Sequence, residues 1–191
     1  MRIIGGDAKG RRIYSPKNSK TRPTSDGIKE SLFNILQEVS GKSFLDLFAG
    51  CGNVGLEALS RGAAKVVFVE KNPVMVNAIK RNLLELGINN KYQILETEAA
   101  KGIKKLQRKG EKFDFLFADP PYEKGFIREI FQYLGEGEMI SSDGVAIFQH
   151  SVREDIPGTL TGTFILTDQR RYGDTRISFF KRMEREKGTH I

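Results

Sequence analysis

The 191-residue sequence holds a single cysteine, two histidines and no long apolar run. One cysteine excludes a disulfide within the chain and fits a reducing compartment, so we expect a cytoplasmic location. His150 and His190 are too few and too isolated for a metal site, and no Cys and His spacing typical of one occurs. No apolar run could span a bilayer, and residues 1–6 lack the layout of a secretory signal, so we expect no membrane association.

Basic residues are in excess, with 31 Lys and Arg against 24 Asp and Glu and a formal net charge of +7. Residues 1–22 hold seven of these cations against Asp7 alone, which predicts contact with a polyanion. Nucleic acid is favoured over a membrane surface because no amphipathic apolar face accompanies the charges. A second basic cluster, 101–112, is interpreted as a solvated face, and a third occupies 170–187.

The order of apolar patterns indicates an α/β fold in one domain, residues 1–191. Residues 1–24 are expected to form a basic β-hairpin and loop, and residues 25–191 the core. Within the core, apolar runs predict strands at 43–48, 65–70, 92–96, 113–117 and 145–149, and helices at 26–36, 53–61, 73–86, 99–108 and 126–134. Two later runs, 164–166 and 177–180, have no helix between them and predict an antiparallel hairpin. Together these patterns predict a mostly parallel seven-stranded sheet covered by helices on both faces.

The apolar run 113–117 ends in Asp119-Pro120-Pro121-Tyr122. Two consecutive prolines prevent both helix and ladder pairing and remove two N–H donors. A carboxylate, backbone carbonyls and an aromatic ring therefore project beyond the end of a strand. A planar group with an exocyclic amine needs acceptors for its N–H bonds and a face to stack on. The motif predicts an enzyme that acts on an amino group of a base.

Glycines at 50, 52 and 55 follow the first core strand with the spacing Gly-x-Gly-x-x-Gly. Such glycines allow a tight turn and a close approach to a ligand, but the spacing suits NAD, FAD and S-adenosylmethionine (SAM) alike, or a tight turn alone. Asp46, just before them, could meet the cationic amino group of SAM but would repel a pyrophosphate. Glu70, at the end of the second strand, could accept both hydroxyls of a ribose.

Other residues near this motif carry weaker signals. Glu98 could accept from an adenine amine, or be a solvated carboxylate at a helix N-terminus. Cys51 is interpreted as a small side chain filling the loop rather than a nucleophile.

These motifs together resemble class I SAM-dependent methyltransferases that act on exocyclic amines. Four flanking segments narrow the resemblance to the RsmD family, whose members are bacterial methylases of guanine N2 in 16S ribosomal RNA. The segments are Arg2-Ile3-Ile4-Gly5-Gly6, Arg22-Pro23-Thr24, Glu30–Asn34 and Leu56–Gly62. The similarity covers nearly the whole chain. It departs at Gly27, where the family usually carries arginine, a cation that Lys29 could replace.

The resemblance implies a Rossmann-like class I methyltransferase fold, SAM as the cofactor, and 16S rRNA as the partner, within the small ribosomal subunit or a late assembly intermediate. A monomer is the default expectation. The catalytic residues it implies are Asp119, Pro120, Pro121 and Tyr122. The cofactor-binding residues it implies are Asp46, Phe48, Gly50, Gly52, Asn53, Gly55, Glu70, Lys71, Glu98, Ala99 and Asp119. The RNA-binding residues it implies are Arg2, Lys9, Arg11, Arg12, Arg22, Thr24, Lys29, Arg170 and Arg171.

Four alternatives remain open from the residues. The Asp-Pro-Pro-Tyr signature also resembles enzymes that methylate adenine N6 in nucleic acid or a glutamine amide in protein. A nicotinamide oxidoreductase would explain the glycines but not Asp46 or the proline motif. A non-catalytic RNA-binding assembly factor would explain the charge but not the cofactor residues.

Overall fold

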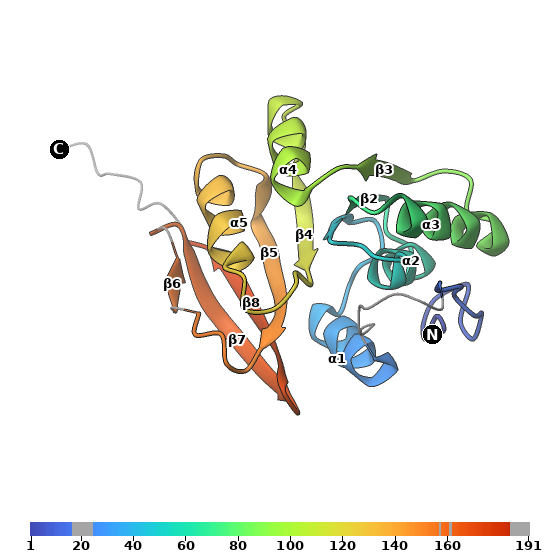
Figure 1. Ribbon diagram of the computed structural model, residues 1–191, viewed down its shortest axis with the longest axis horizontal. Helices are drawn as coiled ribbons and strands as arrows, with labels where there is room; N and C mark the ends of the chain where they lie inside the picture. The colour runs from blue at the N-terminus through green and yellow to red at the C-terminus, as the bar shows by residue number, and fades with distance from the viewer. Residues whose placement is uncertain (17–24, 157, 161, 184–191) are drawn as a thin grey trace.

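A single twisted sheet organises the protein, whose computed structural model describes residues 1–16, 25–156, 158–160 and 162–183. Over these residues the sheet has eight strands in the order β3-β2-β1-β4-β5-β8-β7-β6 (Figure 1). Their bounds are β1 Ser43–Leu47, β2 Lys65–Glu70, β3 Tyr92–Glu96, β4 Phe113–Ala118, β5 Ile140–Ser151, β6 Thr159–Leu160, β7 Phe164–Tyr172 and β8 Thr175–Arg182. Strands β1 to β5 are parallel, whereas β8 runs antiparallel to both β5 and β7. The predicted mostly parallel sheet with a C-terminal antiparallel hairpin is confirmed, and β6 adds a two-residue edge strand.

Helices cover both faces of this sheet and enclose two separate apolar cores. Their bounds are α1 Asp26–Leu36, α2 Asn53–Ser60, α3 Pro73–Leu86, α4 Ala99–Arg108 and α5 Phe126–Gly135. Side chains of α1, α2 and α3 contribute to one core, and those of α4 and α5 to the other. Alternate residues of β1 divide between the cores, with Phe44 in the first and Leu45 and Leu47 in the second.

The start and end of α3 follow from its sequence. The Asn72 side chain accepts a hydrogen bond from the Val74 backbone N–H at 2.9 Å, and Pro73 occupies the first helical position. Gly87 ends the helix with a φ of 74°, a left-handed conformation that glycine adopts without strain. The predicted range 73–86 is therefore confirmed.

Strands β5, β7 and β8 are longer than their apolar runs. The antiparallel ladder between β5 and β8 continues from Val145 paired with Lys181 to Ser151 paired with Thr175. Backbone hydrogen bonds sustain this ladder through polar residues such as Gln149 and His150, which an apolar pattern cannot detect.

The N-terminal arm, residues 1–16, is attached to the core. Arg2 and Arg12 form one antiparallel bridge, flanked by a hydrogen bond from the Ile3 N–H to the Arg11 carbonyl at 2.9 Å. Ile3 and Ile13 are buried in the first core. The arm therefore has only one bridge of the predicted hairpin, and its apolar side chains help to complete the fold.

Candidate active site

The strand order reverses between β1 and β4, and ligands of open α/β sheets bind beyond the carboxyl ends of the strands at such a point. Three predicted carboxylates lie at this edge on adjacent strands. Asp46 is near the end of β1, Glu70 ends β2, and Asp119 directly follows β4. The parallel register therefore brings together residues that are far apart in the sequence.

Asp46 is buried, with 2% of its surface exposed, and its Oδ2 accepts a hydrogen bond from the Gly55 N–H at 2.9 Å. Burial, and to a smaller extent the nearby carboxylates of Asp119 and Glu70, raises the pKa of Asp46 to about 8, and the hydrogen bond from Gly55 opposes this rise. A buried carboxylate of this kind favours a cationic partner, such as the ammonium group of an amino acid.

The three glycines of the loop have different roles. Gly50 has a φ of 56°, and a Cβ added there would meet no atom within 4 Å, so its face of the loop is open to a ligand. Gly52 has a φ of 87° and caps α2. A Cβ at Gly55 would lie 2.3 Å from the Phe68 ring, so this glycine is required for packing of α2 on β2. The role of Gly55 in cofactor binding stays a prediction.

Glu70 links the glycine loop to the next strand. Its two oxygens accept from the backbone N–H groups of Gly50 and Asn72, each at 2.8 Å. Each carboxylate oxygen can accept a second hydrogen bond, so Glu70 keeps acceptor capacity for hydroxyl groups.

The other predicted cofactor residues surround this edge. Phe48 has a φ of 60° and packs edge-on against Phe126, with ring centroids 5.5 Å apart. Glu98 precedes α4, where its exposed carboxylate lies 3.4 Å from the Lys101 ammonium. Asn53 is buried, and its side-chain oxygen accepts from the Lys29 ammonium at 2.9 Å. Of the remaining two, Lys71 is exposed and Ala99 is half-buried.

The proline motif leaves the sheet beside this loop. Burial raises the pKa of Asp119 to about 7, and a hydrogen bond from Gln149 opposes that rise. Pro120 is buried and Pro121 is exposed. The Tyr122 ring is 37% exposed, and its Oη lies 3.4 Å from the Gln149 amide nitrogen. The sequence analysis did not identify Gln149, because only the pairing of β4 with β5 places it beside Asp119.

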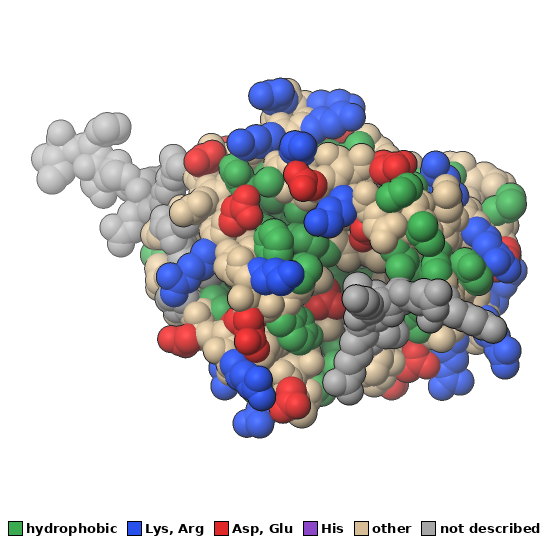
Figure 2. All heavy atoms as spheres, in the orientation of Figure 1, with side chains coloured by type: hydrophobic (Ala, Val, Ile, Leu, Met, Phe, Trp, Pro, Cys, Tyr) green, Lys and Arg blue, Asp and Glu red, His purple; other side chains and the backbone are tan. Residues whose placement is uncertain are grey.

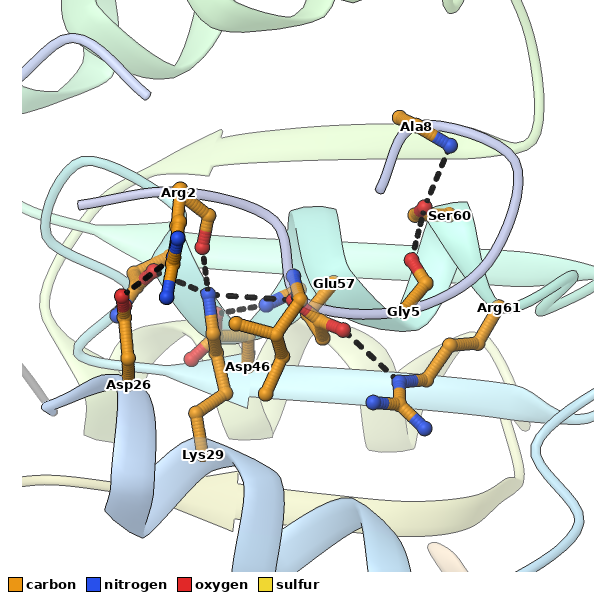
Figure 3. A network of polar contacts seen from close by, with 12 residues as sticks. Arg2, Gly5, Ala8, Asp26, Lys29, Asp46, Glu57, Ser60 and Arg61 are labelled. Carbon is orange, nitrogen blue, oxygen red and sulfur yellow. Dashed lines mark hydrogen bonds and ion pairs between the residues drawn. The ribbon is translucent and has the colours of Figure 1, made fainter. Parts of the chain in front are cut away.

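Lys29 is fully buried, which contradicts its predicted contact with RNA. The suggestion that Lys29 replaces the arginine usually found at position 27 is wrong for the same reason. Its ammonium lies 3.2 Å from the Glu57 carboxylate and donates to the Arg2 carbonyl at 2.6 Å (Figure 3). Glu57 also accepts from the Ile4 N–H at 2.9 Å. Burial lowers the pKa of Lys29, and the contact with Glu57 opposes this shift. Lys29 therefore joins the arm to α1 and α2.

The other candidate cations lie in two segments near α1. Arg2 forms an ion pair with Asp26 at 3.1 Å, and Arg11 donates to the carbonyls of Glu85 and Leu86 at the end of α3. Lys9 and Arg12 are exposed and form no ion pair within the described chain.

The second segment is the end of β7, beside its turn into β8. Arg170 pairs with Asp168 at 3.1 Å, and Arg171 donates to the Gly173 carbonyl at 2.9 Å. Arg22 and Thr24, the remaining predicted contacts, lie outside the described residues.

A chain of contacts connects both segments to the proline motif. The arm reaches α1 through Arg2 and Asp26. Farther along α1, the Ser31 hydroxyl contacts the Tyr172 hydroxyl at the end of β7. Beyond that turn, Thr175 Oγ1 lies 3.4 Å from Tyr122 Oη. The end of β7 and start of β8 thus border the proline motif directly, whereas the arm is connected to it through α1.

A separate basic patch lies on α4, at the top of the view in Figure 2. Helix α4 packs on the face of the sheet opposite to α1, α2 and α3. A shallow surface depression there is lined by Lys101, Lys104, Lys105, Arg108 and Lys109. The described residues contain no cluster of His, Cys, Asp or Glu suited to a metal ion, and none of their helices is long and apolar enough to cross a membrane.

The donors and acceptors at the sheet edge fit SAM. A buried carboxylate suits its ammonium group, Glu70 suits its ribose hydroxyls, and the open face at Gly50 leaves room for the ligand. Fold and site together define a class I SAM-dependent methyltransferase, which removes the nicotinamide oxidoreductase alternative.

Comparisons with known proteins identify the family. The family described as "Conserved hypothetical protein 95" matches residues 1–181. The "Putative rRNA methyltransferase YlbH" of Bacillus subtilis is 32% identical over 183 residues, which cover 95% of this chain and 99% of the relative. The "Ribosomal RNA small subunit methyltransferase D" of Escherichia coli K12 is 30% identical, over 95% of this chain and 90% of the relative. The solved "Putative methyltransferase yhhF" of Escherichia coli superimposes with a TM-score of 0.85 at 27% identity, over 97% and 99% of the two chains. The protein belongs to this family of methyltransferases, the RsmD family.

The raised pKa of Asp46 leads to a prediction about SAM binding. Below about pH 8 the free protein holds a proton on Asp46, and an ammonium ligand would require its removal. Binding should therefore release close to one proton at pH 7, and affinity should rise up to about tenfold per pH unit below the pKa. Calorimetry in two buffers of different ionisation enthalpy measures this release. In Asp46→Asn the proton release that comes from this carboxyl should disappear. If SAM binding to that variant releases as many protons as binding to the wild type, Asp46 does not bind the ammonium group.

Proposed function

We propose that this protein transfers a methyl group from SAM to the exocyclic N2 amine of a guanine in 16S ribosomal RNA of the small subunit. The observation that carries the proposal is the position of Asp119. It follows β4 at the switch point, next to the strand that bears Asp46 and the glycine loop. Acceptors for an amine and a candidate site for a methyl donor thus lie at one edge of the sheet. The names of the relatives support a ribosomal RNA substrate.

The chemistry is an in-line displacement, so orientation contributes most of the rate enhancement. SAM supplies a methyl group activated on a sulfonium. N2 of guanine is a poor nucleophile because its lone pair is delocalised into the ring. The Asp119 carboxylate and the Pro120 carbonyl accept hydrogen bonds from the two N–H groups of this amine. They thereby turn the lone pair toward the methyl group and stabilise the positive charge that develops on nitrogen. The exposed Tyr122 ring stacks on the extruded base, a contact worth about 1–3 kcal/mol.

The proton balance of this scheme needs no separate general base. The N2–CH3 bond forms as the C–S bond breaks, and S-adenosylhomocysteine leaves. The nitrogen then carries an extra proton, which passes to the Asp119 carboxylate or to water. A pKa of about 7 suits Asp119 to accept and release a proton near neutrality.

RNA binding is assigned to the exposed cations of the arm and of the end of β7, beside its turn into β8. The end of β7 and start of β8 border the proline motif directly and the arm is connected to it through α1, so phosphates held there would place a base near Tyr122. The whole chain, residues 1–191, acts in this proposal as one methyltransferase domain, monomeric and cytoplasmic.

The test is transfer of labelled methyl groups from SAM to unmodified small ribosomal subunits, followed by nucleoside analysis by mass spectrometry. N2-methylguanosine at one position is the expected product. Label in N6-methyladenosine or in a protein glutamine would retain the methyltransferase and replace the substrate. SAM binding without transfer to any acceptor would favour a non-catalytic assembly role.

Arg12 provides a prediction about the RNA interface. It is exposed and forms no ion pair in the described chain, so in Arg12→Ala the logarithmic salt dependence of RNA binding should fall by about one, the value for one lost phosphate contact. Filter binding at several salt concentrations measures it. Lys112→Ala is the matched control, because Lys112 pairs with Glu138 at 2.9 Å at the opposite, amino end of β4. Equal salt slopes for the two variants would remove Arg12 from the interface.

A further inference from the structure

Gln149 occupies a buried position that the mechanism above does not use. It lies in β5, where Phe148 pairs with Ala118 of β4, so Gln149 and Asp119 follow on adjacent strands. Phe117 and Ile147, two residues earlier on each strand, belong to the same core. Since side chains alternate along a strand, Asp119 and Gln149 face the same side of the sheet.

The Gln149 amide connects both side-chain groups of the proline motif. Only 4% of the residue is exposed. Its Nε2 donates to Tyr122 Oη at 3.4 Å, and its side chain also donates to the Asp119 carboxylate. Tyr122 Oη in turn lies 3.4 Å from Thr175 Oγ1 on β8. A buried amide whose donors were left unsatisfied would destabilise the fold, so the hydrogen bonds to Tyr122 and Asp119 hold the Gln149 side chain in one orientation.

We propose that Gln149 is a positioning residue for methyl transfer, whose amide holds the Asp119 carboxylate and the Tyr122 hydroxyl in one fixed arrangement. The proposal rests on the assignment of Asp119 and Tyr122 to the amine site. One NH2 group supplies two donors, so it can orient the acceptor and the stacking ring together. Donation to Asp119 also favours the charged form of the carboxylate, the form that can accept both an N–H bond and a proton.

The charged surroundings of Asp119 bear on any measurement of its titration. The Asp46 carboxylate on β1 repels the Asp119 carboxylate electrostatically. Glu123, in the loop after Tyr122, accepts from the Ser151 hydroxyl of β5 at 3.3 Å. Neither of these carboxylates is altered by a substitution at Gln149, so a change in the titration of Asp119 reports the lost amide.

The first test is Gln149→Leu, which keeps the approximate size and removes the donors. The wild-type rate should rise with pH through about 7 as Asp119 ionises. In the variant this rise should move to higher pH, and kcat at neutral pH should fall by about tenfold or more, the size expected for a lost hydrogen bond to a charged group. SAM affinity should not change. Gln169→Leu is the matched control, because the Gln169 amide donates to Ser178 at 2.8 Å within the β7–β8 ladder.

A second variant and a direct titration keep the proposal testable if Gln149→Leu does not fold. Gln149→Glu places a second carboxylate beside Asp119, and the pair should titrate with two separated apparent pKa values. Carbon-13 NMR of the Asp119 carboxyl follows this titration without any RNA. If wild-type protein methylates no RNA, the proposed function fails, while the carboxyl titration still decides the role of Gln149. An Asp119 titration and a pH–rate profile that match those of Gln169→Leu would overturn the proposal.

Discussion

Asp119→Ala should reduce methyl transfer by about 100- to 1,000-fold, the loss seen when one preorganised group that stabilises transition-state charge is removed. The substitution takes away the carboxylate that we propose accepts a hydrogen bond from the guanine amine, and leaves Asp46, Glu70 and the glycine loop in place. SAM binding should therefore remain within a few-fold of wild type. Single-turnover transfer from labelled SAM, together with calorimetry of SAM binding, separates the two effects.

Two comparison variants make this result specific. Asp119→Asn keeps one acceptor oxygen but places an amide NH2 toward the N–H bonds of the amine, so it should be nearly as slow as alanine. Asp143→Ala removes an exposed carboxylate elsewhere in the sheet and should transfer at the wild-type rate. Near-normal turnover in Asp119→Ala would exclude the proposed mechanism.

Lys29→Met should lower the free energy of unfolding by about 3 kcal/mol, the lower end of the range for a broken buried ion pair, because the buried Glu57 carboxylate loses one of its two cations and keeps only Arg61, at 2.9 Å. It also removes the hydrogen bonds that Lys29 donates to the Arg2 carbonyl and to the Asn53 side chain. Urea unfolding followed by circular dichroism measures the change.

The double variant Lys29→Met with Glu57→Leu is the internal control. Removing both charges should restore part of the lost stability, since the buried carboxylate is then absent and the cation that loses its partner is Arg61, whose side chain is 22% exposed. Lys112→Ala breaks an exposed ion pair and should cost no more than about 1 kcal/mol. If Lys29→Met costs as little as Lys112→Ala, Lys29 does not hold the arm to the core.

Local signals in the sequence were sufficient for much of the fold. Asn72, Pro73 and Gly87 bound α3 because capping and left-handed φ values depend on neighbouring residues only. The apolar run ending before Asp119 is confirmed as β4, buried on both faces. The carboxylates at the strand ends could be placed at one edge because parallel strands share the direction of their carboxyl ends.

What the sequence did not reveal are contacts between distant residues. Lys29 has the composition of a surface cation, and only the arm and α2 supply the acceptors that let it be buried. Gly55 belongs to a ligand-binding spacing, yet its need for glycine comes from the Phe68 ring on the next strand. Gln149 lies 30 positions from Asp119, and its relevance depends on strand order. Periodicity does not contain this information.

The docking of the arm has a consequence for how the chain reaches its native state. The Ile4 and Ala8 amides bind side chains 53 and 52 positions later, and Arg11 binds carbonyls 74 and 75 positions later. A ribosome therefore releases the arm well before its docking sites exist: the Ile4 and Ala8 amides gain their partners only when α2 has emerged, and Arg11 only when α3 has emerged. Closing so long a loop is entropically slow, so docking of the arm follows formation of the helices that it contacts. An interruption of synthesis before α2 would leave Ile3 and Ile13 without the core that buries them, and such exposed apolar side chains favour aggregation.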